Sequence, residues 1–188
     1  MIIFLVEEYS MRKFLEGILP RLGFTEPTFE VKHHRGKEDL IRNLNKIIPT
    51  LSKRARQIIL VVDQDKEDCK ELKKKVVEKM QNCACDYKIR VACYELEAWF
   101  LGDMDAIAES SPQFKPKSFQ NKEKYRNVDG IEKPSEVIKK IVPRWEKDYP
   151  SKPKFAEKMA KVVSLESQAN RSHSFYILLE TLKAVKEK

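Results

Sequence analysis

Apolar blocks and amphipathic blocks alternate along the first hundred positions of the chain. Four short segments rich in β-branched and aromatic residues have the length of strands: residues 1–6, 29–34, 57–62 and 87–94. Between them, apolar residues recur every three or four positions, which is typical of amphipathic helices, over residues 10–22, 37–51 and 67–81, and a further helical stretch begins at residue 95. Strands that alternate with amphipathic helices form parallel sheets with helices on both faces.

The pattern changes after Ser110. The next two dozen residues are polar and weakly periodic, which predicts a long loop or insertion with short helical pieces, and three helices are expected after it, at residues 134–142, 154–163 and 172–185. We therefore predict an α/β fold, a Rossmann-like open parallel sheet of about four strands flanked by helices, with a C-terminal helical extension. We expect residues 1–105 to form the α/β core, and residues 106–188 to form the insertion and the helices that pack on that core within one structural domain.

Acidic residues directly follow three of the four predicted strands. They are Glu7 and Glu8 after the first strand, Asp63 and Asp65 after the third, and Glu95 and Glu97 after the fourth. In an open α/β sheet the carboxyl ends of parallel strands share one edge, where ligands bind. We therefore expect carboxylates from three separate segments of the chain to meet at one place.

Carboxylates crowded into one place repel each other unless a cation lies among them. Oxygen ligands favour hard cations, so the expected cofactor is Mg²⁺ or Mn²⁺. Asp63 and Asp65 are two positions apart in an extended segment, so both are expected to point the same way and to reach one ion or a pair. A carboxylate-bound Mg²⁺ can hold substrate phosphates and orient an attacking water in phosphoryl transfer. The alternative for Asp65 is a cap at the N-terminus of the helix that follows.

The net charge and the cysteine content indicate which partners and which cellular compartment to expect. The chain has 37 Lys and Arg against 29 Asp and Glu, a formal net charge of +8, so we expect a nucleic acid as partner, although a solvated lysine-rich surface gives the same totals. No secretory signal precedes the four cysteines, which predicts a cytoplasmic protein. The longest apolar run is far too short to span a membrane, so no membrane partner is expected. The sequence does not predict the oligomeric state.

Three segments together resemble the TOPRIM fold: "FLVEEYSMRKFLEGILPRL", "ILVVDQDKEDCKELKKKV" and "RVACYELEAWFLGD". With "KPKFAEKMA" and "NRSHSF" near the C-terminus, the chain is similar to a small prokaryotic TOPRIM-related family, a domain of unknown function akin to OLD-family nucleases. TOPRIM domains have a Glu after the first strand and Asp-x-Asp after a later one, matched here by Glu7, Asp63 and Asp65. Many have glycine directly after the glutamate; this chain has Glu8 there, which suits a divergent, nuclease-like branch.

The resemblance implies a Mg²⁺-dependent enzyme that cleaves phosphodiester bonds in DNA or RNA, with a role in phage defence or as a toxin. Glu7, Asp63 and Asp65 would be its catalytic residues, Glu7 as general acid/base or metal ligand and the two aspartates as metal ligands. Glu97 is the expected fourth ligand in preference to Glu95, and for both the alternative is an ordinary acid in the first turn of a helix.

Basic residues near the same edge are candidates for binding substrate phosphates. His34, Arg35 and Lys37 follow the second predicted strand, where an ordinary polar turn is the alternative. Arg171 and Ser174 lie at the start of the last predicted helix, whose free N–H groups suit an anion, although helix capping alone explains the serine. The family resemblance adds the last of these substrate-binding candidates, Lys154.

Two other functions stay open. Haloacid-dehalogenase-type phosphatases also use Asp-x-Asp after a strand, but there the pair follows the first strand, whereas here it follows the third and precedes Lys66. The main alternative to a nuclease is a non-catalytic nucleic-acid-binding or regulatory protein. Because OLD-type nucleases work with ATPase domains and this chain has no phosphate-binding loop motif, such a protein would be the partner of a separate ATPase.

Overall fold

Four parallel strands form the centre of the computed structural model, which describes residues 1–149 and 151–186. They are β1 (Ile2–Val6), β2 (Phe29–His33), β3 (Gln57–Asp63) and β4 (Asp86–Ala92). The order across the sheet is β2-β1-β3-β4, and every neighbouring pair is parallel. The predicted α/β class and four-stranded parallel sheet are confirmed.

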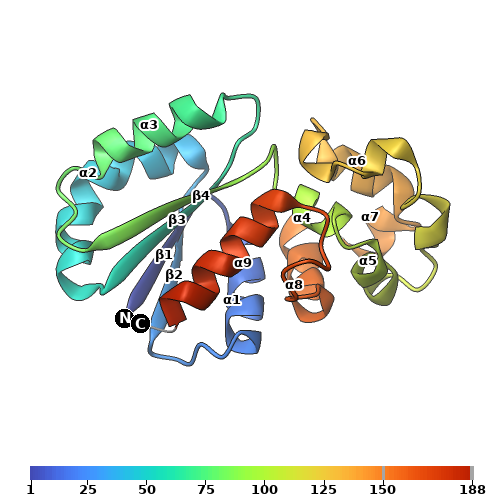
Figure 1. The fold of residues 1–188 in the computed structure, drawn as a ribbon, viewed down its shortest axis with the longest axis horizontal. Helices are drawn as coiled ribbons and strands as arrows, with labels where there is room; N and C mark the ends of the chain where they lie inside the picture. The colour runs from blue at the N-terminus through green and yellow to red at the C-terminus, as the bar shows by residue number, and fades with distance from the viewer. Residues whose placement is uncertain (150, 187–188) are drawn as a thin grey trace.

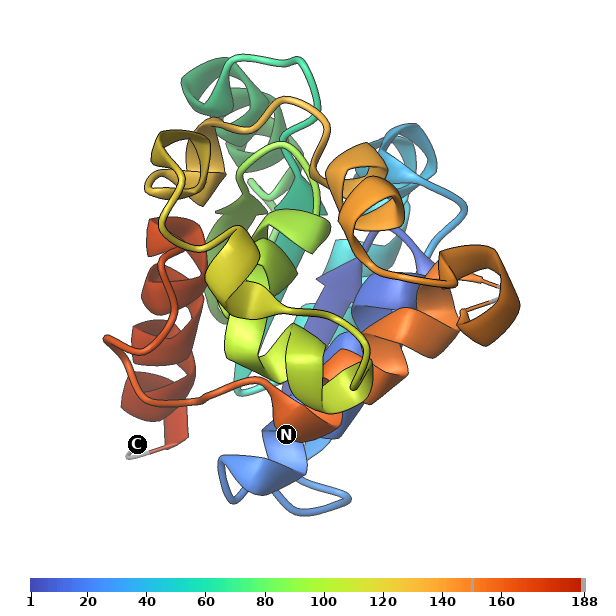
Figure 2. The same ribbon diagram turned by 90° about the vertical axis from the view of Figure 1, so that its right-hand side faces the viewer.

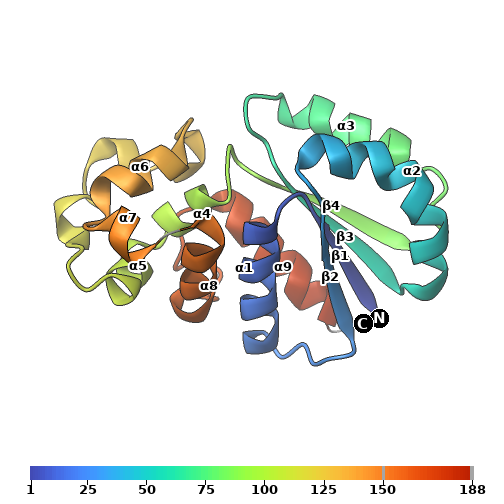
Figure 3. The ribbon, with the colours of Figure 1, turned by 180° about the vertical axis from the view of Figure 1, so that it is seen from behind.

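Alternate residues of the two central strands face two separate cores. Ile2, Phe4 and Val6 of β1 pack into one core with helices α1 (Tyr9–Arg21) and α9 (His173–Lys186). Ile3 and Leu5 pack into the other with α2 (Lys37–Arg54) and α3 (Cys69–Lys79). One pair of helices therefore covers each face, as Figures 1 and 3 show from opposite sides. A strand buried on both faces needs apolar residues at every position, which explains the unbroken apolar runs of β1 and β3.

A group of short helices follows β4 and gathers beyond the carboxyl ends of the strands, the end that faces the viewer in Figure 2. It contains α4 (Glu97–Leu101), α5 (Met104–Ser110), three 3₁₀ turns (Pro116–Ser118, Glu123–Tyr125 and Val128–Gly130), α6 (Pro134–Ile141), α7 (Trp145–Asp148) and α8 (Lys152–Val162). The insertion thus has the short helical pieces that the sequence predicts.

The helical stretch that starts at residue 95 is broken at Gly102. A Cβ at that position would lie 1.9 Å from the side-chain oxygen of Asn170, and the backbone N–H of Arg171 donates to the Gly102 carbonyl at 3.0 Å. The carboxylate of Asp103 then caps α5 by accepting from Ala106 N–H at 3.0 Å. The close approach of the segment before α9 therefore ends one helix and starts another.

Helix α8 attaches the helical group to the core by packing along α1. A Cβ added to Gly17 of α1 would lie 2.5 Å from the Cβ of Ala160, so the two backbones approach closely. Arg21 at the end of α1 donates to the carbonyl oxygens of Ala160 at 2.6 Å and Val163 at 2.8 Å. Within the residues that the structure describes, no helix combines the length and the apolar character needed to cross a membrane.

Candidate metal centre at the carboxyl edge of the sheet

Three carboxylates from three separate segments are buried at the carboxyl edge of the sheet. Glu7 directly follows β1, Asp63 is the last residue of β3, and Glu97 is the first residue of α4. Only 6%, 5% and 4% of their surfaces, respectively, are exposed. The shared edge of β1 and β3 brings the first two together, and the tight turn from β4 into α4 delivers the third.

Each of these carboxylates has an oxygen that is buried without a hydrogen-bond partner. The atoms are Glu7 Oε2, Asp63 Oδ1 and Glu97 Oε2, and the described residues contain one other such side-chain atom, Ser52 Oγ. Buried polar atoms in folded proteins are almost always paired, so each exception needs an explanation. Three such oxygens gathered at one sheet edge are an arrangement that a bound cation would complete.

Burial and nearby negative charges raise the pKa of all three carboxylates. Burial, then the nearby charge of Asp65, raises the pKa of Glu7 to about 7, while Lys37 opposes the rise. Burial also raises the pKa of Asp63 well above its usual range, reinforced by Glu7 and Glu97. The site therefore favours a positive species among its carboxylates, whether protons or a metal ion.

The three buried carboxylates are not positioned to coordinate a metal ion together. Among residues 1–149 and 151–186, no three His, Cys, Asp or Glu side chains are placed so that they could hold a metal ion as they stand. Glu7 and Glu97 each act on the charge of Asp63, so a cation held by all three would require their side chains to rearrange.

Asp65 lies at the same edge but in a different environment from Asp63. Its backbone is left-handed, with φ of 53°, and its N–H donates to the carbonyl of Tyr94 at 2.8 Å. Its carboxylate is half-exposed and lies 2.6 Å from the ammonium of Lys37. The expectation that both aspartates point the same way is therefore wrong, because the left-handed residue interrupts the alternation of an extended strand.

The N-cap alternative for Asp65 is also wrong. Helix α3 is capped by Asp68, whose carboxylate accepts from the backbone N–H groups of Lys70 at 2.8 Å and Glu71 at 3.0 Å. Asp65 is left with Lys37 as its ion-pair partner.

The two other acidic residues at this edge, Glu95 and Glu8, lie at helix N-termini and also act on the charge of the cluster of three buried carboxylates. Glu95 accepts from Ser135 N–H at 2.8 Å and so holds the first turn of α6. Glu8 occupies the N-cap position of α1 and is half-buried. The charges of Glu95 and Glu8 still add to the rise in the pKa of Glu97, which burial causes first and Lys152 opposes.

Lys152, which the sequence reasoning missed, is the lysine of α8 that contacts the cluster. Its ammonium lies 3.4 Å from Glu97 Oε1, and 40% of its side-chain surface is exposed. Burial lowers the pKa of Lys152, but neighbouring carboxylates, Glu97 first, outweigh that effect and raise it. The predicted Lys154 is an exposed residue one position after Pro153. Both belong to "KPK", and only the packing of α8 decides which of them faces Glu97.

A cleft of about 970 Å³ opens beside the cluster, between the β3–α3 loop and α6. Its lining includes Lys37, Asp65 and Glu95 from the edge itself. Three further lysines line it: Lys66, Lys133 and Lys140. Four glutamates complete the charged lining, so carboxylates outnumber lysines there: Glu38, Glu67, Glu132 and Glu136. The three buried carboxylates do not line the cleft.

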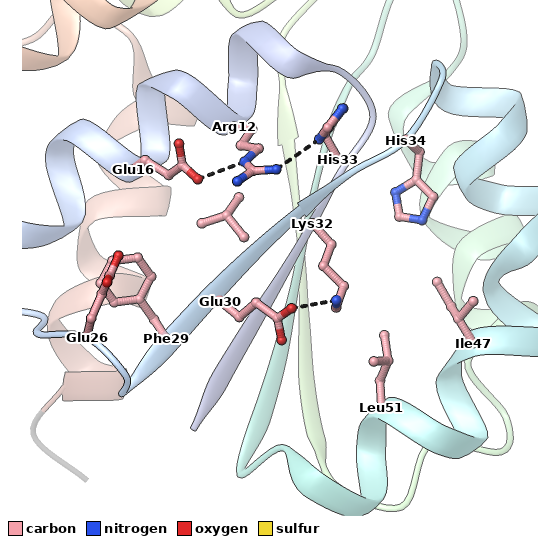
Figure 4. Close-up of a pocket in the computed structure, with 11 residues that line it drawn as sticks. Arg12, Glu16, Glu26, Phe29, Glu30, Lys32, His33, His34, Ile47 and Leu51 are labelled. Carbon is pink, nitrogen blue, oxygen red and sulfur yellow. Dashed lines mark hydrogen bonds and ion pairs between the residues drawn. The ribbon is translucent and has the colours of Figure 1, made fainter.

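A second hollow, of about 580 Å³, follows the open edge of β2 and is shown in Figure 4. Arg12 lies across it, donating to Glu16 at 2.7 Å and lying 3.4 Å from His33 Nδ1. His34 is directed back to β1, with Nδ1 3.1 Å from the carbonyl of Val6, and Arg35 is exposed at the following turn. None of the three buried carboxylates lines this hollow.

The N-terminus of α9 is already satisfied by a carboxylate of the chain itself. Asp129 accepts from Ser174 N–H at 2.8 Å and from the hydroxyl of Ser172 at 2.6 Å, and Ser172 accepts from Phe175 N–H at 3.1 Å. Arg171 donates to the backbone carbonyl of Gln120 in the insertion. The capping alternative is confirmed for Ser172, whereas the hydroxyl of Ser174 accepts from the indole N–H of Trp99 at 2.9 Å. Asp129 is a residue that no local sequence signal indicates.

Comparison with known proteins gives one positive result. Residues 6–183 match the family model described as DUF4276, a domain of unknown function. No curated protein and no solved structure gives a significant match to the chain.

Proposed function

Because the chain belongs to the DUF4276 family, whose function is unknown, we propose its function from the site: a Mg²⁺- or Mn²⁺-dependent enzyme that cleaves phosphodiester bonds in DNA or RNA. The observation that carries the proposal is the group of three buried carboxylates, each with an unpartnered oxygen, at one edge of a parallel sheet. We further propose that the fold is a divergent member of the TOPRIM superfamily, which the all-parallel sheet and the positions of Glu7 and Asp63 support.

The residues present fit a hard divalent cation. Glu7, Asp63 and Glu97 would hold it through carboxylate oxygens, the ligands that Mg²⁺ and Mn²⁺ prefer. Each of the three has one buried oxygen without a partner, and this holds even for Glu97, whose other oxygen lies near Lys152. When bound, such an ion binds a substrate phosphate and lowers the pKa of a coordinated water.

The chain's own groups supply the rest of the chemistry. Glu7 has one of two roles: it holds the ion as a deprotonated ligand, or its carboxyl, whose pKa is about 7 in the metal-free protein, accepts a proton from water near neutral pH. The half-exposed ammonium of Lys152 lies beside Glu97 and can bind a phosphate oxygen that approaches the cluster. Single lysines of the adjacent cleft, such as Lys133 and Lys140 on its α6 side, can contact the sugar–phosphate backbone without reading its sequence, while carboxylates outnumber lysines in the lining as a whole.

The test is cleavage of labelled single-stranded DNA, duplex DNA and RNA by the purified protein with Mg²⁺, Mn²⁺ or EDTA. We expect metal-dependent cleavage that falls by about 100-fold or more in Glu7→Gln, Asp63→Asn and Glu97→Gln. Glu78→Gln is the matched control, because Glu78 is an exposed glutamate of α3 outside the cleft lining and should leave the rate unchanged. Cleavage that survives EDTA, or that persists in all three variants, would refute the proposal.

The alternative is a non-catalytic nucleic-acid-binding protein that acts with a separate ATPase. It is favoured by one observation: among the described residues, no three side chains are positioned to coordinate a metal ion. The two proposals differ in a binding measurement. Nucleic acid bound with equal affinity with and without Mg²⁺, and never cleaved, would support the alternative, whereas metal-dependent cleavage would exclude it.

A further inference from the structure

The ammonium of Lys37 is surrounded by oxygen atoms at the carboxyl end of β3. It donates to the carbonyl oxygens of Asp63 at 3.1 Å and Gln64 at 3.2 Å and to Asp65 Oδ2 at 2.6 Å, and it lies 3.1 Å from Glu67 Oε1. Only 12% of the Lys37 side-chain surface is exposed. Two backbone carbonyls and two carboxylates in this arrangement are the ligand set of a hard cation.

The position of Lys37 is fixed by the backbone. Gly36, with φ of 98°, donates from its N–H to the carbonyl of Glu7 at 2.8 Å, so the loop from β2 crosses the end of β1. Helix α2 begins at the next residue, Lys37, whose side chain extends across to the end of β3. A positive φ at this position favours glycine, which makes Gly36 part of the placement.

Lys37 has no donor left for a substrate. An ammonium carries three N–H donors, and four protein oxygens already surround this one. Lys37 also pairs with the carboxylate of Asp65 at 2.6 Å, so Asp65, although its charge acts on Glu7, is not among the acids with an unpartnered buried oxygen. The residue is therefore placed to supply charge at a fixed point rather than to bind a phosphate.

We propose that Lys37 occupies the position of a second cation, so that the protein binds one divalent metal ion and not two. The inference rests on the proposed function, because it assumes that Glu7, Asp63 and Glu97 hold the one ion. It assigns Asp65 and Glu67 to Lys37 instead of to a metal. A second divalent cation would have to displace an ammonium that is largely buried and bonded on every side.

The test counts bound metal on the full chain. Calorimetric titration with MnCl₂, checked by the electron paramagnetic resonance signal of free Mn²⁺, should give one ion per chain for the wild type. The count is repeated with a short phosphorothioate DNA strand, since a second ion can depend on a substrate phosphate. Asp65→Asn should also bind one ion, because Asp65 is not a ligand in this arrangement.

Lys37→Met removes the ammonium and leaves its four oxygens, so we expect the count to rise to two. Lys66→Met, at an exposed lysine of the same loop, is the matched control and should stay at one. The double variant Lys37→Met/Asp65→Asn should return to one, since the second position has lost a carboxylate.

The outcomes separate this inference from the proposed function. Two ions in the wild type would overturn the inference and leave the metal centre standing, whereas no bound ion would overturn both. A folded Lys37→Met protein that still binds one ion would show that Lys37 does not exclude the second. Should Lys37→Met fail to fold, the wild-type count and Asp65→Asn decide: loss of the ion in Asp65→Asn makes Asp65 a ligand and overturns the inference.

Discussion

Glu7 is a carboxylate whose charge changes near neutral pH. Its pKa is raised from 4.5 to about 7, first by burial and then by the charge of Asp65. A carboxyl with a raised pKa keeps its proton in the folded protein at a pH where the unfolded chain has lost it. Between these two values the folded state binds more protons, so the free energy of unfolding falls as the pH rises.

We therefore expect the metal-free protein to lose stability from mildly acidic to neutral pH. If Glu7 acted alone, the loss would be on the order of 3 kcal/mol, complete above its pKa in the folded state. Glu7→Gln should flatten this dependence, measured by urea unfolding at a series of pH values in EDTA. The exposed Glu132→Gln should keep the wild-type slope. Equal slopes for wild type and Glu7→Gln would contradict the assignment of the raised pKa.

Mg²⁺ should change the same measurement in a defined direction. Ligands bind a metal when deprotonated, so the ion replaces the protons that the cluster holds. Saturating Mg²⁺ should raise the free energy of unfolding most at high pH, where the carboxylates are charged and uncompensated. The effect should be absent in Asp63→Asn, whose buried oxygen can no longer serve as an anionic ligand. Equal stabilisation of the variant by Mg²⁺ would place the ion elsewhere.

At the scale of single elements, the sequence predicts what depends on local pattern. The apolar runs of β1 and β3 indicate strands buried on both faces, and the strand ends then bring Glu7 and Asp63 to one edge. The direction of the Asp65 side chain could not be predicted, because a strand pattern does not reveal a single left-handed residue. Here that residue is Asp65 itself, whose N–H donates to the carbonyl of Tyr94 after β4.

Contacts between elements that are distant in sequence could not be predicted. Lys152 faces Glu97 only because α8 packs along α1, and nothing in "KPK" distinguishes its two lysines. Asp129 lies 45 positions before Ser174, whose N–H it accepts. The periodicity of apolar residues in a helix or strand reveals which face is buried. It does not reveal which polar residue from a remote loop will reach a helix terminus.

Helix α9 should depend on Asp129 for stability. The Asp129 carboxylate meets the N-terminus of α9, where a negative charge and a capping acceptor are both favourable. Asp129→Ala should lower the free energy of unfolding by about 1–2 kcal/mol, measured by urea denaturation. Asp105→Ala, at an exposed acid in the first turn of α5, is the control and should cost less. Wild-type stability with strengthened nucleic-acid binding in Asp129→Ala would instead indicate that this terminus, once freed of its carboxylate, binds a substrate anion.

At the scale of the whole molecule, the site depends on how the helical group is attached to the sheet. The sheet supplies Glu7 and Asp63, whereas α4 supplies Glu97 and α8 supplies Lys152. Helix α8 is fixed along α1 by the close approach of Gly17 and Ala160 and by the two hydrogen bonds from Arg21. The contact between α1 and α8 therefore joins the two halves of the proposed site.

Gly17→Ala tests this contact, because its new Cβ would lie 2.5 Å from the Cβ of Ala160. Alanine favours a helix over glycine by about 1 kcal/mol, so an exposed position would be stabilised. Here we expect the clash to prevail and lower the free energy of unfolding by about 1–3 kcal/mol, measured by urea denaturation. The double variant Gly17→Ala/Ala160→Gly removes the opposing methyl group and should regain most of the stability lost to the clash. It should keep only the cost of placing a glycine inside α8. A stabilised Gly17→Ala protein, or a double variant less stable than the sum of the two single changes, would show that α1 and α8 do not pack this closely.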